Sequence, residues 1–326
     1  MMREKWVVGV DLGGTTTKLA FINVEGEIIE KWEIETDHSD AGKNITANIA
    51  KSIDQKLKEQ GETKDKLIGV GMGSPGPVNY KAGILYNAVN LPWEDHYPLK
   101  KNLEEAIHLP ALIDNDANCA ALGEMWKGAG NGAKDLVCVT LGTGVGGGVI
   151  TNGKIVQGVS GAAGEIGHIT VIPDGGAPCN CGKTGCLETV ASATGIVRLA
   201  NLKLKEEGLA EGLLVKIYEE NGSITAKDVF DCAKLGDAAC LEIIDEVAFY
   251  LGLVLANLGN TLNPEKIVLG GGVSKAGDIL LDKVQSYFDK YAFSRVKDTT
   301  KISIATLGND AGVIGAGWLV MNEQFQ

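Results

Sequence analysis

Three cysteines stand close together in this chain, Cys179, Cys181 and Cys186, and His168 precedes them. Glycines between the second and third cysteine let the chain fold back so that the thiolates converge. Three sulfur ligands and one imidazole form the closed tetrahedral set of a structural zinc site. The alternative is three unrelated thiols; an iron–sulfur cluster is disfavoured because only three cysteines are close. The spacing therefore predicts zinc held by these four side chains.

Carboxylates and amides occur at the ends of predicted loops. The run Asp114–Asn118 follows a short apolar stretch and opens a predicted helix. Either Asp114 or Asp116 is the N-cap of that helix, or one of them is a base that accepts a hydroxyl proton. Glu165 and Glu188 bracket the cysteine run, and they are either solvated or bind a polyol, whose hydroxyl groups suit directional acceptors and donors. The amides that could join such a site are Asn90 and Asn115.

Glycine is in excess, with 44 residues in the chain, about twice its usual ~7% share. Two loops, Asp11–Thr17 and Gly142–Gly148, follow apolar runs and combine glycine with threonine. Backbone N–H groups surround a phosphate only where no side chain blocks its approach, and threonine hydroxyls add donors. Asp11 could hold Mg²⁺ through water, and Lys18 adds positive charge. Together with the stretch Leu269–Val273, these loops predict a nucleotide site.

Two common nucleotide motifs are disfavoured. Neither loop matches the P-loop pattern. The stretch Gly142–Gly147 fits G-x-G-x-x-G, but Val149 and Ile150 continue as a strand where a dinucleotide-binding fold needs a helix. A Rossmann site for a nicotinamide cofactor is therefore not expected.

Apolar periodicity predicts a repeated α/β plan. Strands are expected at Trp6–Val10, Lys18–Asn23 and Glu27–Glu35, with a glycine–threonine turn between the first two. Strand, turn, strand, turn, strand recurs over residues 136–156, which indicates two domains of shared design that each give one loop to a common cleft. The alternative is that glycine-rich turns are simply common. Further strands are expected at Leu67–Met72, Ala111–Asp114 and Lys266–Leu269, and helices at Ile45–Gln60, Leu103–His108, Ala117–Met125, Val247–Leu258 and Ala311–Asn322.

Composition excludes several classes of protein. The 326 residues suggest about two domains at ~150 residues each. The formal charge of −12 disfavours broad nucleic-acid binding. Trp6–Val10 is too short for a signal-peptide core of ~7–15 apolar residues, and no apolar run reaches the ~18 that span a bilayer. In a chain without an export signal, the seven cysteines favour metal or core roles over disulfides. Core positions are expected for Cys119, Cys138, Cys232 and Cys240.

Together these motifs resemble the ROK family of bacterial sugar kinases, and the match covers nearly the whole chain. Within that family, Cys186–Thr194 is most similar to the glucokinases of low-GC Gram-positive bacteria. The resemblance implies the two-domain α/β ATPase fold of actin, hexokinase and Hsp70, with duplicated ribonuclease H-like domains and an active-site cleft between them. It is carried by Asp11–Thr15, Gly73–Gly76, Asn115–Asn118, Leu141–Gly147, Gly164–His168, the cysteine run with Glu188, and Leu269–Gly272.

The expected domain boundary lies near Asp116–Cys119, and the C-terminal helix is expected to return to the first domain. This divides the chain into a small α/β domain of residues 1–117 plus 306–326 and a large α/β domain of residues 118–305. The large domain would contain the zinc-binding loop.

The resemblance implies ATP-dependent phosphorylation of D-glucose at its 6-hydroxyl, with Asp116 as the catalytic base, Mg²⁺ assisted by Asp11, and structural Zn²⁺. His168 would bind zinc with one ring nitrogen and offer the other to a sugar hydroxyl. The sugar would be held by Asn90, Asn115, Asp116, Glu165, His168 and Glu188. The phosphates would be lined by Gly13, Gly14, Thr15, Thr16, Lys18, Gly142, Thr143 and Gly144, with Gly271 and Gly272 near the adenosine.

Other functions remain open at this point. One is a kinase for another hexose or N-acetylhexosamine, such as N-acetylmannosamine, mannose or fructose. Another is a non-catalytic sugar-responsive regulator, for whose N-terminal helix-turn-helix a phosphate motif starting at Asp11 leaves no room. An actin-like or Hsp70-like ATPase acting on proteins would not need the zinc loop. We expect a cytoplasmic homodimer of glycolysis that binds hexose and ATP, but neither nucleic acid nor membrane.

Overall fold

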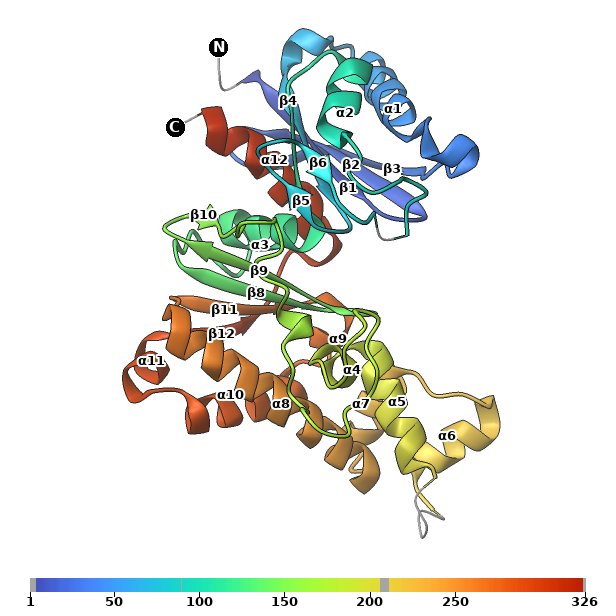
Figure 1. Ribbon diagram of the computed structural model, residues 1–326, viewed down its shortest axis with the longest axis vertical. Helices are drawn as coiled ribbons and strands as arrows, with labels where there is room; N and C mark the ends of the chain where they lie inside the picture. Colours follow the sequence, from blue (N-terminus) through green and yellow to red (C-terminus); the bar gives the residue numbers. More distant parts are fainter. Residues whose placement is uncertain (1–3, 89, 206–210, 325–326) are drawn as a thin grey trace. The chain divides into compact units, whose positions relative to one another are not determined.

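This computed structural model describes residues 4–88, 90–205 and 211–324. They contain two five-stranded sheets whose strands follow the same order. Their orders are β3-β2-β1-β4-β7 and β10-β9-β8-β11-β12 (Figure 1). In both sheets, three strands that are consecutive in the chain lie side by side, and two later strands extend the sheet beyond the first of them. The shared order confirms the predicted repeat and the predicted α/β class.

The first sheet combines antiparallel and parallel pairs. β1 pairs antiparallel with β2 and parallel with β4, while β2–β3 is antiparallel and β4–β7 parallel. Val7, Val8 and Val10 are fully buried, as expected for a central strand covered on both faces. The strands are β1 (Trp6–Leu12), β2 (Thr16–Asn23), β3 (Ile28–Glu35), β4 (Leu67–Ser74) and β7 (Ala111–Asn115).

Helices cover both faces of this sheet. Val8 and Val10 share a core with Ile49 of α1, whereas Val7 packs with Val313 of α12. Because successive side chains of a strand point to opposite faces, α1 and α2 lie on one face and α12 on the other (Figure 1). The elements are α1 (Ile45–Glu59), α2 (Leu99–Ile107), α3 (Asp116–Lys127), α12 (Ala311–Gln324) and the hairpin strands β5 (Val78–Asn79) and β6 (Ile84–Leu85).

Helix α2 begins one turn earlier than predicted. The sequence pattern indicated Leu103–His108, but Leu99, Leu103 and Ile107 are all fully buried. Their i, i+4, i+8 spacing forms the apolar stripe of a helix that starts at Leu99. The other predicted strands and helices of this part are confirmed, with boundaries that differ by a few residues.

The second sheet repeats the arrangement. β8, β11 and β12 run parallel, and β9 and β10 form an antiparallel pair. β8 leads through the glycine-rich turn into β9 rather than into a helix, which confirms that the Rossmann interpretation was rightly disfavoured. The strands are β8 (Leu136–Leu141), β9 (Val145–Thr151), β10 (Lys154–Ile155), β11 (Lys266–Gly270) and β12 (Lys301–Ile304).

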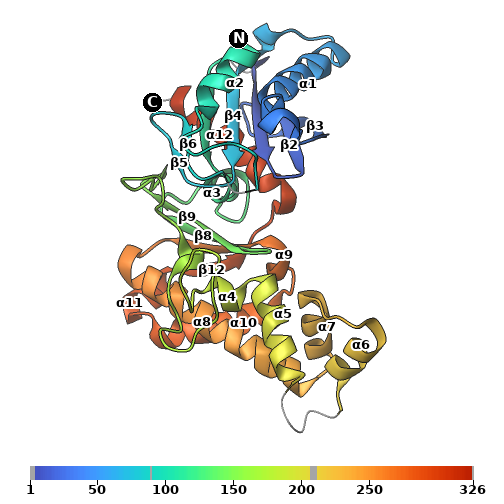
Figure 2. The same cartoon turned by 45° about the vertical axis from the view of Figure 1, so that its right-hand side comes forward.

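Most of the helices follow β10 in the chain. Helix α8 contains the predicted apolar run, and Val247, Leu251 and Leu255 are fully buried, as a core helix requires. Figure 2 shows α5, α6 and α7 packed together. The helices are α4 (Glu188–Ala191), α5 (Ala193–Lys203), α6 (Leu213–Asn221), α7 (Ala226–Lys234), α8 (Ala238–Leu262), α9 (Gly271–Ser274), α10 (Asp278–Tyr291) and α11 (Ser294–Thr299).

The chain divides into two compact units. The first comprises Met1–Lys134, Gly148–Gly164 and Leu307–Gln326, and the second comprises Asp135–Gly147 and Glu165–Thr306. Helix α3 thus falls in the first unit, although most of its residues were expected in the large domain that begins at residue 118. The reason is close packing on α12, where a Cβ added to Gly315 would lie 1.7 Å from the carbonyl oxygen of Cys119. The expected domain ranges stay a prediction, and their ends at 1–3 and 325–326 lie outside the described residues.

Four cysteines serve the core. Cys119, Cys138, Cys232 and Cys240 are buried, which confirms the expectation from their apolar segments. Among the residues that the structure describes, no helix has the length and apolar character needed to cross a membrane.

Candidate active site and metal centre

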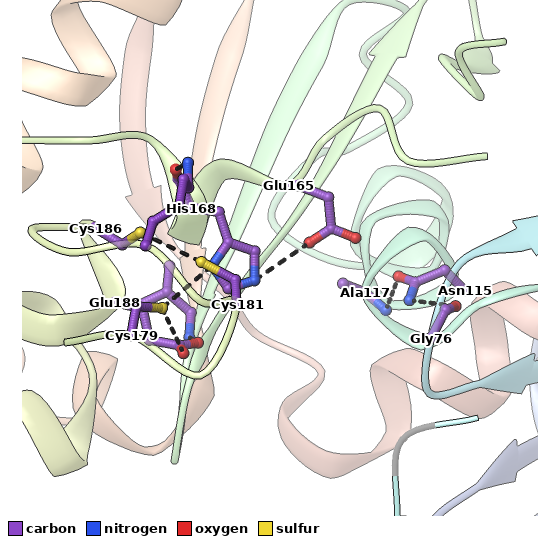
Figure 3. Close-up of polar contacts among 11 residues, drawn as sticks. Gly76, Asn115, Ala117, Glu165, His168, Cys179, Cys181, Cys186 and Glu188 are labelled. Atoms are coloured by element: carbon purple, nitrogen blue, oxygen red, sulfur yellow. Dashed lines mark hydrogen bonds and ion pairs between the residues drawn. The ribbon is translucent and has the colours of Figure 1, made fainter. Parts of the chain in front are cut away.

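The predicted zinc ligands converge in the second unit. The ligand atoms of His168, Cys179, Cys181 and Cys186 all lie within 4.8 Å of one another. His168 Nδ1 is 3.6 Å from Cys179 Sγ, and the Sγ atoms of Cys181 and Cys186 are 3.6 Å apart (Figure 3). Tetrahedral zinc with Zn–S bonds of ~2.3 Å separates its sulfur ligands by about 3.8 Å. The donor set and its spacing therefore fit zinc.

The loop that carries the cysteines is folded by short backbone bridges. Thr170 pairs with Cys186, and Pro178 pairs with Thr184. Gly185 has a φ of +69°, and a Cβ there would lie 1.8 Å from the carbonyl oxygen of Ile172, so only glycine fits. Burial raises the pKa of Cys186 to about 12, and neighbouring thiols contribute. A divalent cation would offset this effect, because metal ligation requires thiolates.

His168 turns its two ring nitrogens to different neighbours. Nδ1 faces Cys179, and Nε2 lies 3.9 Å from Oε2 of Glu165 (Figure 3). One nitrogen therefore lies in the metal-ligand cluster and the other faces a carboxylate, while the expected contact of the second nitrogen with a sugar hydroxyl stays a prediction.

Glu188 lies between the cysteine cluster and the second glycine turn. Its Oε1 is 3.8 Å from Cys179 Sγ, and its Oε2 accepts a 2.8 Å hydrogen bond from the backbone N–H of Val145. A Cβ on Gly144 would lie 2.4 Å from the same Oε2, so the carboxylate can approach only because residue 144 is glycine. Glu188 thus joins the metal loop to the turn.

The second glycine turn is held by the start of α5. The N–H of Gly142 donates to the carbonyl of Gly144, and the N–H of Ala193 donates to the carbonyl of Gly142. Thr194 Oγ1 donates to the carbonyl of Thr143 at 2.9 Å. In the stretch after β11, one glycine is in close contact with the backbone of Leu141 and the next has free space around it. Gly271 has a φ of +83° and lies against Leu141, whereas a Cβ on Gly272 would meet no atom of the described residues within 4 Å.

The first glycine turn, in the first unit, is held by its own sheet. Gly13 N–H donates to the carbonyl of Thr16, and Thr36 Oγ1 donates to the carbonyl of Gly13 at 2.8 Å. The N–H of Thr36 donates to the carbonyl of Thr15. The carbonyl oxygen of Asn90 would lie 2.9 Å from a Cβ added to Gly14.

Asp11 lies at the end of β1 beside this turn. Lys18 Nζ is 4.0 Å from its Oδ2. Burial raises the pKa of Asp11, and the charge of Lys18 opposes that shift. The carboxylate and the ammonium are therefore close enough to act on one anionic ligand and its cation.

Asn115 caps helix α3. Its side-chain oxygen accepts hydrogen bonds from the N–H groups of Ala117 and Asn118, and its amide nitrogen donates to the carbonyl of Gly76 at 3.1 Å (Figure 3). The interpretation of Asp114 or Asp116 as the N-cap was therefore wrong, because the residue between them fills that position. Asp116 is half-buried at the first helical position, with Oδ1 2.7 Å from the backbone nitrogen of Ala117.

Asp114 is fully buried and occupied within the protein. It accepts hydrogen bonds from Asn118, Gln157 and the N–H of Asn115. Of the two aspartates, Asp116 is the less buried.

The predicted site residues form two groups, one in each unit. The sequence interpretation missed Thr36 and Gln157, which belong to no motif and contact the site across long stretches of chain. The first unit holds Asp11, Gly13, Gly14, Thr15, Thr16, Lys18, Asn90, Asn115 and Asp116. The second holds Gly142, Thr143, Gly144, Glu165, His168, Cys179, Cys181, Cys186, Glu188, Gly271 and Gly272.

Known proteins resemble this chain along almost its whole length. Residues 7–323 match the ROK family. The chain is 58% identical to the glucokinase of Halalkalibacterium halodurans, over 99% of this chain and 97% of that relative. It is 30% identical to the xylose repressor of Caldicellulosiruptor bescii, over 97% of this chain and 78% of the repressor. A solved ROK family glucokinase from Streptomyces griseus, in complex with glucose and AMPPNP, is 33% identical with a TM-score of 0.77, covering 96% of this chain and 98% of that one.

Proposed function

The chain belongs to the ROK family, and on that premise we propose that it is a glucokinase, which transfers the γ-phosphoryl group of ATP to the 6-hydroxyl of D-glucose. The observation that carries the proposal is 58% identity to a glucokinase over 99% of the chain. The Streptomyces griseus relative, solved with glucose and AMPPNP, supports the pairing of a hexose with an adenine nucleotide.

Asp116 is proposed as the general base. As the new P–O bond forms, its carboxylate accepts the proton of the attacking hydroxyl group, and the bond between the γ-phosphorus and the bridging oxygen of ADP breaks. Asn115 supports this role by capping α3, which fixes Asp116 as the first residue of the helix. Phosphoryl transfer otherwise requires positioning and charge neutralisation rather than covalent chemistry.

The sugar is proposed to bind Asn90, Asn115, Glu165, His168 and Glu188 together with Asp116. Asn115 already uses its oxygen and one amide N–H within the protein, so it has one further N–H to offer a hydroxyl group. His168 offers the Nε2 side of its ring, next to Glu165.

The metal assignments follow from the donor sets. Zinc would be held by His168, Cys179, Cys181 and Cys186, where it would fix the tautomer and orientation of His168. Magnesium, when bound with ATP, neutralises phosphate charge, and Asp11 would assist it. The two glycine turns, with Lys18, Gly271 and Gly272, would receive the nucleotide. The family resemblance further suggests a cytoplasmic homodimer of glycolysis.

A sugar-responsive regulator is the candidate from another class, since a xylose repressor shares 30% identity with the chain. A regulator would bind sugar without consuming ATP. Turnover therefore separates the two functions.

Specificity is tested by measuring kcat/KM with Mg-ATP across glucose, mannose, fructose and N-acetylmannosamine. We expect the highest value with glucose and release of ADP that depends on the hexose. ADP release that no hexose accelerates would reject the kinase proposal, and a higher kcat/KM for another sugar would reject glucose.

A further inference from the structure

A buried polar network surrounds Asp114 at the junction of β7 and α3. Asp114, 1% exposed, accepts hydrogen bonds at Oδ1 from the N–H of Asn115 at 2.7 Å and from Asn118 Nδ2 at 2.9 Å. At Oδ2 it accepts from Gln157 Nε2 at 2.7 Å. The three donors come from the junction itself, from the first turn of α3, and from a segment 43 residues away in the chain.

The two side-chain amides of this network direct their nitrogen atoms at the carboxylate. Their oxygen atoms, Asn118 Oδ1 and Gln157 Oε1, are buried and accept no hydrogen bond among the described residues. A buried acceptor without a donor costs free energy. Rotating either amide would place its oxygen against the Asp114 carboxylate, so the observed orientation is the one that satisfies the charge.

Gln157 comes from a segment of the first unit that is exposed at Gly158, Val159 and Ser160 and contacts the rest of the unit at Gly161. A Cβ on Gly161 would lie 2.1 Å from the carbonyl oxygen of Val78, and the N–H of Ala163 donates to the carbonyl of Gln157. These contacts limit the movement of the backbone around Gln157, whose half-buried side chain donates to the Asp114 carboxylate.

Resting on the role proposed for Asp116, we propose that Gln157 and Asp114 form a clamp that positions the turn Asn115–Asp116. The clamp holds the end of β7 through the hydrogen bonds that Asp114 accepts, while Asn115 caps α3. Gln157 and Asp114 are thus positioning residues: neither touches the sugar, and both set where the Asp116 carboxylate is held.

The test exchanges the two groups. Gln157→Glu places two carboxylates face to face, whereas the double variant Asp114→Asn/Gln157→Glu restores one carboxylate and one amide with their positions reversed. In the double variant, the new amide oxygen at position 114 would still accept from the N–H of Asn115 and from Asn118. Asp65→Asn, at an exposed position of the same unit, is the matched control.

Four quantities are measured: kcat, the KM for ATP, the melting temperature, and hydrogen exchange at the N–H groups of Ala117 and Asn118. For Gln157→Glu we expect kcat to fall about tenfold or more, exchange to quicken and the KM for ATP to stay within about twofold. The double variant should recover kcat to within about threefold of wild type and regain slow exchange. Asp65→Asn should change none of these.

The clamp is overturned by a Gln157→Glu enzyme with wild-type kcat and exchange, or by a double variant whose kcat and exchange are no better than those of Gln157→Glu. A purely structural role would lower the melting temperature while leaving kcat per folded enzyme unchanged, and it too rejects the proposal. If Gln157→Glu does not fold, Gln157→Ala replaces it, with a severalfold loss of kcat expected and an unchanged kcat overturning the clamp.

Failure of the proposed function is distinguishable. A wild-type protein that forms no sugar phosphate would reject the kinase, whereas the exchange rates of the swap series would still decide whether the clamp holds the turn.

Discussion

The two glycine turns stand at equivalent places in the duplicated sheets but are held in different ways. The first, Gly13–Thr16, joins β1 to β2 and is tied by Thr36, which follows β3 of the same sheet. The second, Gly142–Gly144, precedes β9 and is tied by helix-borne groups, the N–H of Ala193 and the carboxylate of Glu188.

The difference shows where the second half of the repeat has been elaborated. Between β10 and α5 the chain carries Glu165, His168 and the cysteine cluster, for which the described residues of the first half hold no counterpart after β3. The first half carries instead Asp114 within the end of β7 and Asp116 directly after it, whereas the corresponding strand β12 is followed by Ala305 and Thr306. The duplicated strand order thus supplies two glycine turns, and each half adds a different part of the proposed chemistry.

Asp116→Asn removes the carboxylate that the first half has after β7 and the second half lacks after β12. We expect the largest loss of kcat from this substitution. Loss of the general base should lower kcat by about 10²–10⁴-fold, while glucose binding stays within about threefold because the amide keeps the shape of the side chain. Steady-state kinetics and glucose titration calorimetry measure the two. An Asp116→Asn enzyme with near-normal kcat would remove Asp116 from this role.

Cys181→Ala tests whether the second turn depends on metal. The side chain is exposed, so its truncation leaves no cavity in the core, and any loss of stability is expected to come from lost zinc. We expect the metal content to fall, the melting temperature to drop and the KM for glucose to rise roughly tenfold or more. Thr184→Ala, an exposed change in the same loop, is the control. Wild-type protein purified without stoichiometric zinc would contradict the assignment.

Gly144→Ala tests the contact between the second turn and Glu188. The added methyl group would lie 2.4 Å from Glu188 Oε2, which forces the turn and the carboxylate apart. We expect kcat/KM for ATP to fall about tenfold. Gly142→Ala is the comparison for stability, because a Cβ at that position would meet no described atom within 4 Å; we expect the melting temperature to fall in Gly144→Ala but not in Gly142→Ala. Equal effects of the two substitutions would show that the approach of Glu188 is not what requires glycine.

Thr36→Val and Thr194→Val compare the hydroxyl groups that hold the two turns. Thr36 is buried, so its loss leaves the carbonyl of Gly13 and the hydroxyl of Thr17 short of a partner and should lower the free energy of unfolding by about 1–3 kcal/mol. Thr194 donates to Thr143 from an exposed position, and its loss should cost less than about 1 kcal/mol. Urea unfolding measures both. A larger effect at residue 194 would reverse the comparison.

Local chemistry made much of this predictable from the sequence. The cluster of His168 with three cysteines, the glycine turns and the duplicated strand order follow from residues that are near one another in the chain. The first turn of α2 was missed because Leu99 shows its role only beside Leu103 and Ile107. Thr36 and Gln157 were missed because their contacts reach across 23 and 43 residues to Gly13 and Asp114. The N-cap alternative for Asp114 or Asp116 was wrong because Asp114, Asn115 and Asp116 are all capping residue types, and only the backbone geometry selects Asn115.

The central claim, that this chain phosphorylates glucose on its primary alcohol, is tested most directly by following the products with phosphorus and proton NMR. With wild-type protein, glucose and Mg-ATP, we predict one glucose 6-phosphate for every ADP. Formation of ADP without a sugar phosphate, or phosphate on another hydroxyl group, would contradict it.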